Sequence, residues 1–329
     1  MAESKIKFGV SMYSFTCEFY AGRFSLEDMM AKIAEIGGKG FECVAASNVP
    51  NYPWPTQQYI DQFIRLAQKY RLQPVSYGAY IDKKLRHDRE MTEPEIIRST
   101  VNDIEYAHRF GFQVMRTQHL ITPAILEKII PYAEAYNIKV GVEVHIPHLL
   151  KTPTIQGYIN MLKRVNSPFI GLIPDFGIFM ERPNKFYIEY AVKKGANEKI
   201  FLHIADCQYR GIQKEAVVEE VKKMGGNAVD LEMVSEIYTK MSYGPADTAT
   251  LADIMPHVFY MHGKFYYINE GLEDPSIAYH KILPVIRDSG YDGYIMTEYE
   301  GHLFGGFVAD PVEMCKRHIQ MEHKILGLS

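Results

Sequence analysis

The sequence predicts an α/β protein: a single (β/α)8 barrel domain over residues 1–329, with an α-helical insertion at about 177–258 between strands six and seven. Two observations predict this fold class. Short apolar runs typical of strands alternate with amphipathic segments typical of helices, which is the pattern of a parallel sheet covered by helices. Several of the runs are apolar throughout instead of alternating with polar residues, as in strands that are buried on both faces.

Each strand-like run is placed by its position in this alternation. In the first half of the chain, strands are expected at 5–13, 38–46, 73–81 and 112–118, and helices at 24–38, 56–72, 92–111 and 122–137. In the second half, strands are expected at 139–145, 169–175, 258–268 and 290–301, and helices at 157–166 and 274–290. The eight strands match the number that closes such a barrel.

Local signals mark the ends of several of these helices. Ser25 and Asp28 fit a capping box at the start of the first helix, and Gly37 marks its end. Thr92 is the expected cap of a later helix. Pro123 takes the first position of the next helix, where its missing N–H costs no hydrogen bond. The helix boundaries are therefore predicted from local chemistry as well as from periodicity.

The stretch from about 177 to 258 is much longer than the other connections between strands. Within it, residues 191–209 and 214–226 have the composition of helices. We interpret the whole stretch as an α-helical insertion at the barrel mouth, where loops carry specificity. It could serve as a lid or as an oligomer contact.

Two histidines compete for a place on the seventh strand. His203 lies in KIFLHIA and His262 in VFYMHGKFYYI, and periodicity alone does not separate a short strand from a helix in the first of these. The second run is richer in aromatic residues and stands directly before the last helix–strand unit. The strand count therefore favours His262.

Four polar residues end strand-like runs, namely Glu143, Asp175, His262 and Glu298. A buried carboxylate is costly without a partner. Several of them delivered to the same end of a barrel favour a divalent cation at an enzyme site. Three carboxylates and one imidazole form a mainly oxygen ligand set, which favours manganese, magnesium or iron. The alternative is that each carboxylate pairs with an arginine or a lysine.

Short motifs around these residues carry a resemblance to a known family: EVHIPH, LIPDFGIF, HGKF and EYEGH, with GYDG before the last strand. The chain resembles the xylose-isomerase-like TIM barrels, the sugar phosphate isomerase/epimerase superfamily. Within that superfamily it resembles the α (large) subunit of bacterial C-glycoside deglycosidases.

The resemblance implies a function and a site. It implies that Glu143, Asp175, His262 and Glu298 bind manganese, with magnesium, cobalt or iron as alternative metals. It implies a partner, a small β-subunit in a hetero-oligomer, and cleavage of the C–C glycosidic bond of 3-oxo-C-glycosides. It also implies a catalytic role for His145, which lies two residues after the metal-binding Glu143.

The residues themselves are compatible with this chemistry. An extended strand directs His145 and Glu143 to the same side, and an imidazole suits proton transfer at neutral pH. Removal of the acidic proton next to the carbonyl of a 3-oxo-sugar, followed by loss of the C1 aglycone, would make the enzyme a lyase. Return of the proton to another face or carbon would make it a sugar isomerase or epimerase, which is the alternative function. The residues after Asp175 are the apolar 176–178, where many sugar epimerases of the superfamily have a polar side chain.

Two other charged side chains near strand ends each have two possible roles, one in substrate binding or catalysis and one in an ion pair. Arg116 ends the fourth strand and is expected either to bind a substrate oxygen or to form a salt bridge. Lys264 is directed like His262 and is expected either to stabilise developing negative charge in catalysis or to pair with Glu270 or Glu300.

Aromatic residues and further histidines are expected around the mouth. Tyr52 and Trp54 lie in a loop after the second strand, where their rings could stack on a sugar or a flat aglycone, or simply pack within the loop. Tyr299 follows the last metal ligand and is expected to shape the substrate pocket. His148 and His302 are expected at the surface.

Composition excludes several partners. The net charge of −4 and the isoelectric point near 6.3 provide no basic surface for nucleic acid, as an endonuclease of the same superfamily would need, or for an anionic membrane. The apolar part of the N-terminus is too short for a signal peptide, and no stretch approaches the roughly 18 apolar residues of a membrane span. The four cysteines are far apart and have no CxxC spacing, which argues against a structural zinc site and for reduced thiols in the cytoplasm. We therefore expect a cytoplasmic enzyme.

Overall fold

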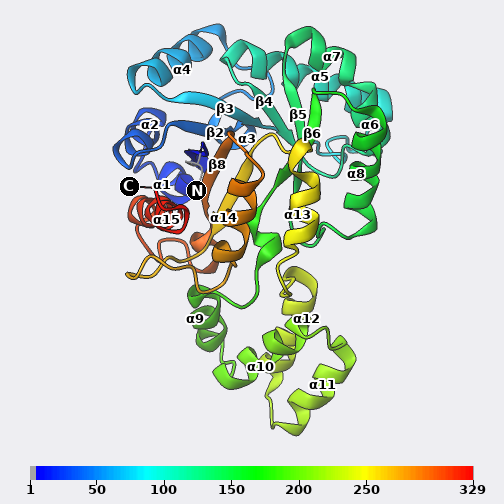
Figure 1. Ribbon diagram of the computed structural model, residues 1–329, viewed down its shortest axis with the longest axis vertical. Helices are drawn as coiled ribbons and strands as arrows, with labels where there is room; N and C mark the ends of the chain where they lie inside the picture. The colour runs from blue at the N-terminus through cyan, green and yellow to red at the C-terminus, as the bar shows by residue number, and fades with distance from the viewer. Residues whose placement is uncertain (1–4, 329) are drawn as a thin grey trace.

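Eight parallel strands form one sheet, in the order β6-β5-β4-β3-β2-β1-β8-β7, in the computed structural model, which describes residues 5–328. Isolated parallel bridges join Leu172 to Val258 and Asp175 to His262, and so bring β6 against β7 to close the sheet on itself. The predicted (β/α)8 TIM barrel is confirmed (Figure 1). The strands are β1 Lys7–Ser11, β2 Gly40–Val44, β3 Gln73–Gly78, β4 Val114–Thr117, β5 Lys139–Val144, β6 Ile170–Pro174, β7 Met261–Phe265 and β8 Tyr294–Tyr299.

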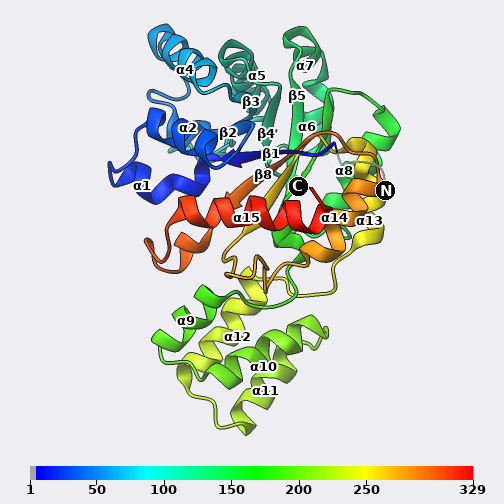
Figure 2. The same cartoon turned by 60° about the vertical axis from the view of Figure 1, so that its left-hand side comes forward.

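Helices surround this barrel on its outer side, as two views of the molecule show (Figures 1 and 2). Short 3-10 helices follow β1, β6 and β8 at the carboxyl ends of the strands: η1 Met12–Phe15, η2 Phe176–Phe179 and η4 Gly301–Phe304. The outer helices are α1 Thr16–Tyr20, α2 Leu26–Glu35, α3 Ala45–Asn48, α4 Gln57–Lys69, α5 Glu93–Phe110, α6 Pro123–Lys128, α7 Ile130–Tyr136, α8 Pro153–Val165, α13 Thr248–Ile254, α14 Tyr279–Asp288 and α15 Pro311–Leu326.

The predicted helix starts are confirmed, and one predicted helix is divided. Ser25 and Asp28 form the reciprocal bonds of a capping box, and Thr92 does the same with Glu95. The segment expected as a single helix over 122–137 breaks at its middle into α6 and α7. Pro131 explains the break, because it has no N–H to donate and its ring collides with the carbonyl four residues earlier.

Between β6 and β7 the chain forms four helices that project away from the barrel (Figures 1 and 2). They are α9 Lys185–Lys193, α10 Glu198–Tyr209, α11 Lys214–Lys223 and α12 Ala228–Lys240. The segment expected as one helix over 191–209 is interrupted at Gly195, which has a φ of 104°. Val217, Val221 and Val234 are completely buried where α11 and α12 meet, so these helices share an apolar interface of their own. Throughout residues 5–328, no helix combines the length and apolarity needed to cross a bilayer.

The inside of the barrel has an apolar floor beneath a charged layer. Side chains of Val114, Ile173, Tyr260 and Met296 form a small buried cluster within the barrel. Gly141 makes room for this floor, because a Cβ there would lie 2.4 Å from Cδ1 of Ile173. The next inward-facing positions along the same strands, two residues further on, are the charged or imidazole residues of the candidate site.

Candidate metal centre

Four side chains from consecutive strands β5 to β8 converge at the carboxyl ends of the strands. Glu143 ends near the top of β5, Asp175 directly follows β6, His262 is in β7 and Glu298 is in β8. All four are buried, and one ligating atom from each lies within 4.8 Å of those from the others. The structure therefore brings together all four residues that the sequence singled out as metal ligands.

His262 is at the centre of this group. Its Nδ1 lies 3.1 Å from Oε1 of Glu143, 3.3 Å from Oε2 of Glu298 and 3.8 Å from Oδ2 of Asp175. The opposite ring nitrogen, Nε2, faces away from these carboxylates. His203, the competing candidate, lies on α10 and not on a strand, so the assignment of the seventh strand to His262 is confirmed.

The charged layer has more negative than positive groups. Lys264 and Arg116 are its permanently charged cations, and five carboxylates lie around them: Glu42, Glu143, Asp175, Glu298 and Glu300. Burial is the main reason that the pKa of Glu300 is raised to about 7, with the nearby carboxylates adding to the effect and Lys264 opposing it. Oδ2 of Asp175 and Oε2 of Glu298 are buried and accept no hydrogen bond, although Lys264 Nζ lies 2.7 and 3.6 Å from them. Lys264 and Arg116 do not balance the five buried carboxylates, and this excess of negative charge together with the oxygen-rich donor set fits a divalent cation.

Arg116 is buried between two of the carboxylates. Its Nη1 donates to Oε2 of Glu143 at 2.7 Å, its Nε donates to Oε2 of Glu42 at 3.0 Å, and its Nη2 reaches Tyr80 at 2.9 Å. Burial alone would raise the pKa of Glu143, but the charge of Arg116 and the hydrogen bond with His262 hold it well below its usual range. Of the two roles expected for Arg116, the structure shows the salt bridge.

Lys264 makes contacts with the candidate ligands themselves. Its Nζ lies 2.7 Å from Asp175 and 3.2 Å from Glu300. Glu300 was one of the two predicted ion-pair partners, and it is the one that the structure places here. Because Lys264 also lines the cavity above the cluster, its ammonium group faces both the carboxylates and the space for a substrate.

Glu42 is a member of the site that the sequence reasoning missed. It is completely buried in the middle of β2, and its Oε2 lies 3.0 Å from Nε2 of His262. Since a carboxylate accepts, Nε2 donates its proton to Glu42, and Nδ1, which faces the other three candidate ligands, is the ring nitrogen that would bind a cation in place of a proton. Ser11 and Tyr260 also donate hydrogen bonds to Glu42. A signal was present, because a glutamate inside the apolar run GFECV needs a partner, but Glu42 is not at a strand end.

We expect Glu42→Gln to weaken Mn2+ binding by about 10–100-fold, because carboxylate partners of metal-bound histidines orient the ring and increase its basicity. Isothermal titration calorimetry with Mn2+ measures the change. Glu322→Gln is the matched control, since Glu322 is equally buried but lies on α15, outside the cluster. Equal affinity in Glu42→Gln and the wild type would show that Glu42 does not orient His262.

A cavity of about 210 Å³ lies directly over the cluster. Its walls are Tyr13, Tyr80, Arg116, Gln118, Glu143, His145, Lys264, Glu298 and Glu300. His145 Nδ1 lies 2.7 Å from the carbonyl oxygen of Ile146, and its buried Nε2 has no hydrogen-bond partner. A carbonyl oxygen only accepts, so Nδ1 carries a proton and Nε2 is the ring nitrogen left to exchange a proton with a substrate. Nε2 is thus the ring nitrogen of His145 that no protein group occupies beside the candidate metal cluster.

Other predicted mouth residues lie elsewhere. Trp54 is 71% exposed and does not line the cavity. Tyr299 is buried and packs on Phe265 with ring centroids 5.5 Å apart, since it follows Glu298 in β8 and faces the opposite side of the strand. The structure therefore does not bring Tyr299 into the cavity. Tyr13, which follows β1, and Tyr80, which follows β3, provide aromatic walls instead.

The expected surface position of His302 is wrong. This residue is half-buried, and its ring lies 5.3 Å from that of Tyr13. Burial lowers the pKa of His302 to about 4, and the charge of Lys264 acts in the same direction. His302 is therefore a neutral group behind the aromatic wall of the cavity.

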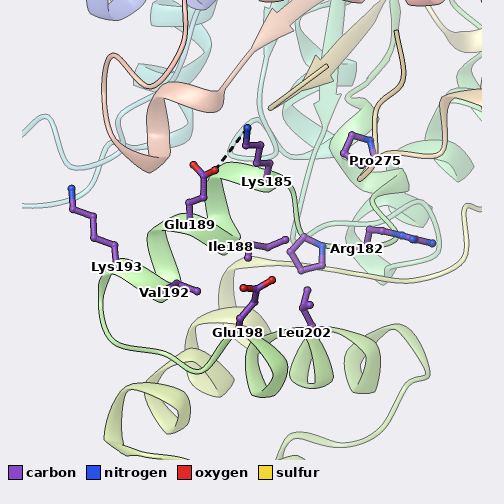
Figure 3. Close-up of a pocket in the computed structure, with 10 residues that line it drawn as sticks. Arg182, Lys185, Ile188, Glu189, Val192, Lys193, Glu198, Leu202 and Pro275 are labelled. Carbon is purple, nitrogen blue, oxygen red and sulfur yellow. Dashed lines mark ion pairs between the residues drawn. The ribbon is translucent and has the colours of Figure 1, made fainter. Parts of the chain in front are cut away.

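A larger cavity of about 690 Å³ lies outside the barrel (Figure 3). Ile188 of α9 and Leu202 of α10 face each other across it, and Lys185 pairs with Glu189 at its edge. The walls are mainly apolar, and they include none of the four candidate ligands. This cavity is therefore not the chemical centre.

Comparison with known proteins agrees with this fold. A family model described as a xylose isomerase-like TIM barrel matches residues 30–320. The chain belongs to the xylose isomerase-like TIM barrel family. Members of this enzyme family that are similar to the chain include the 3′-dehydrocarminate deglycosidase alpha subunit of Microbacterium sp., at 30% identity over 338 aligned residues, covering 98% of this chain and 95% of that protein.

A further curated relative and one solved structure extend the comparison. The C-glycoside deglycosidase alpha subunit of Arthrobacter globiformis is 29% identical, with 89% of this chain and 83% of that protein covered. The structure of D-allulose 3-epimerase from Methylomonas sp. superimposes with a TM-score of 0.57 at 12% identity, covering 99% of this chain and 100% of that one. The second similarity concerns the fold alone.

Proposed function

We propose that this chain is the metal-dependent catalytic subunit of a C-glycoside deglycosidase, a lyase that cleaves the C–C glycosidic bond of 3-oxo-C-glycosides. The observation that carries the proposal is the unpartnered Nε2 of His145, in the small cavity that two of the four candidate metal ligands, Glu143 and Glu298, also line. Relatives along nearly the whole chain are named deglycosidase alpha subunits, which supports this substrate class.

The reaction requires removal of a proton from the carbon next to the sugar carbonyl. His145 Nε2 accepts this proton, and Ile146 keeps the ring in the required tautomer by accepting from Nδ1. A divalent cation bound by the four ligands supplies Lewis-acid polarisation of the carbonyl. The electron pair of the broken C–H bond then forms a C=C bond to C1. The bond between C1 and the aglycone breaks, and the aglycone leaves with the electron pair of that bond and with the proton that His145 returns. Lys264 stabilises negative charge that develops on the substrate.

The function is tested by product analysis of the purified protein, assembled with its partner subunit, on a 3-oxo-C-glycoside in D2O. We expect mass spectrometry to detect the free aglycone and an unsaturated keto-sugar. An epimerised substrate with the aglycone still attached would contradict the lyase and establish the epimerase alternative. A free ketose is the control substrate, and we expect it to be recovered unchanged.

We propose manganese as the metal, because the ligand set contains three carboxylates and no sulfur. His262→Ala is expected to abolish Mn2+ binding, and His203→Ala is expected to retain it, as measured by metal analysis after dialysis. Circular dichroism verifies that both variants are folded. Retention of stoichiometric Mn2+ by His262→Ala would contradict the proposed site. Magnesium, cobalt or iron in the purified wild type would contradict the choice of manganese but not the position of the site.

We propose a second, smaller subunit as the partner of this chain, since the relatives are named alpha subunits. Co-expression of the chain with the reading frame next to its gene tests this proposal. A stable complex with a short second chain is the expected result in size-exclusion chromatography with mass determination. Full deglycosidase activity of the isolated chain would contradict a required partner.

A further inference from the structure

A second group of metal-ligating side chains lies outside the barrel, on the projecting helices α10 and α11 (Figures 1 and 2). His203 and Cys207 are four residues apart on α10, so they lie on the same face of the helix. Glu220 comes from α11 and meets them. His203 is not part of the barrel site. Its ring instead lies beside a thiol and a carboxylate on the projecting helices.

The three side chains are already close to the geometry of a metal site. His203 Nε2 lies 2.9 Å from Oε2 of Glu220 and 3.4 Å from Sγ of Cys207, and Sγ lies 3.7 Å from the same carboxylate oxygen. Tetrahedral zinc with ordinary bond lengths places such N, O and S ligands about 3.4–3.6 Å from one another. Movements of about half an ångström therefore suffice to place one ion among them.

We propose that His203, Cys207 and Glu220 form a separate binding site for a divalent cation of intermediate softness, Zn2+ or Co2+. One thiolate, one imidazole and one carboxylate are the ligand types that such ions prefer. The barrel cluster has no sulfur ligand and suits a harder ion, so the two sites differ in metal preference.

The surroundings of His203, Cys207 and Glu220 determine how an ion would reach this site and which further ligand it would keep. Cys207 is buried, whereas the side chains of His203 and Glu220 are 28% and 42% exposed, so an ion can enter from solvent and keep a water as fourth ligand. Arg210 also touches the site, with Nη2 3.6 Å from Sγ of Cys207, while its Nε pairs with Asp206 at 2.9 Å. Binding replaces the thiol proton and joins α10 to α11 through one ion.

The cysteine spacing in the sequence argued against a structural zinc site, because no second cysteine is near any of the four. The structure supplies the missing ligands from other residue types. The i, i+4 pair on α10 is visible in the sequence, but Glu220 joins it only because α11 folds back along α10.

Cobalt titration of the full-length protein tests the site. A thiolate ligand produces a near-ultraviolet sulfur-to-cobalt charge-transfer band, which the sulfur-free barrel cluster does not produce. We expect a saturable band at one cobalt per chain that Zn2+ displaces. Manganese binding at the barrel, measured in the same samples, reports the other site independently.

Three variants test whether the cobalt charge-transfer band comes from Cys207 and Glu220. Cys207→Ser is expected to lose it, whereas Cys315→Ser, a change at another buried cysteine, is expected to retain it. Glu220→Gln, at a partly exposed position that should not affect folding, is expected to weaken Co2+ binding by about tenfold while the band at saturation remains. No band in the folded wild type, or an unchanged band in Cys207→Ser, would overturn the proposal.

Discussion

Replacing His145 with glutamine is expected to lower kcat/KM for a 3-oxo-C-glycoside by about 10²–10⁴-fold, the usual contribution of a positioned general base. Glutamine has a similar size but no lone pair of comparable basicity. The buried Nε2 of His145 accepts no hydrogen bond from the protein, so it is available to accept the substrate proton. The glutamine variant has no such acceptor. Solvent deuterium exchange at the carbon next to the carbonyl should fall with kcat/KM.

His148→Gln is the matched control for this prediction. His148 lies in the same loop, with its ring 4.5 Å from the ring of His119, but it does not line the cavity. We expect near wild-type turnover from this variant and full Mn2+ content from both variants. If His145→Gln retained full turnover, or lost activity only by losing metal, His145 would not be the base.

Replacing Arg116 with methionine is expected to reduce the free energy of unfolding by about 3–5 kcal/mol, because removing one member of a buried ion network leaves buried charges uncompensated. Arg116 is 2% exposed and bonds to both Glu42 and Glu143. Urea unfolding at pH 7 without added metal measures the loss. Arg164→Met removes a surface ion pair with Glu127 and should cost only about 0–1 kcal/mol.

The effect of Arg116→Met should also depend on pH. In the wild type the pKa values of Glu42 and Glu143 are held below their usual 4.5, in spite of burial, by Arg116 and His262. Depressed carboxylate pKa values stabilise the fold above the unfolded pKa, and this stabilisation is lost as the pH falls. The difference in the free energy of unfolding between the wild type and Arg116→Met should therefore be constant above about pH 5 and narrow as the pH falls below 4.5. A gap that is constant with pH would show that lost packing, and not charge, causes the destabilisation.

The two candidate metal clusters differ in how visible they are in the sequence. Glu143, Asp175, His262 and Glu298 stand where buried runs end, and parallel strands of a barrel deliver their ends to one place. His203 and Cys207 show the spacing of one helical turn, but their third member comes from another helix. A shared end of a sheet is implied by topology, whereas the contact between two helices depends on packing.

Some misplaced predictions had a signal in the sequence. Strand alternation separates Tyr299 from Glu298, so its position outside the cavity follows from the same period that placed the ligands. Pro131 marks the break between α6 and α7. The apolar run KIFLHIA is different, because a short run of this kind fits a strand or a helix, and packing against α11 and α12 decides for the helix.

The sequence by itself determined the barrel, the order of its strands and the four candidate ligands. Strands buried on both faces appear in the sequence as short apolar runs, and the candidate ligands appear as polar residues at the ends of these runs. Only the tertiary structure decided what surrounds those ligands. Glu42 supports His262 across 220 residues, Arg116 joins Glu42 to Glu143, and Tyr13 and Tyr80 form the walls. These contacts depend on the distance and direction between side chains in the folded protein. The residues next to a side chain in the sequence do not indicate that distance or direction.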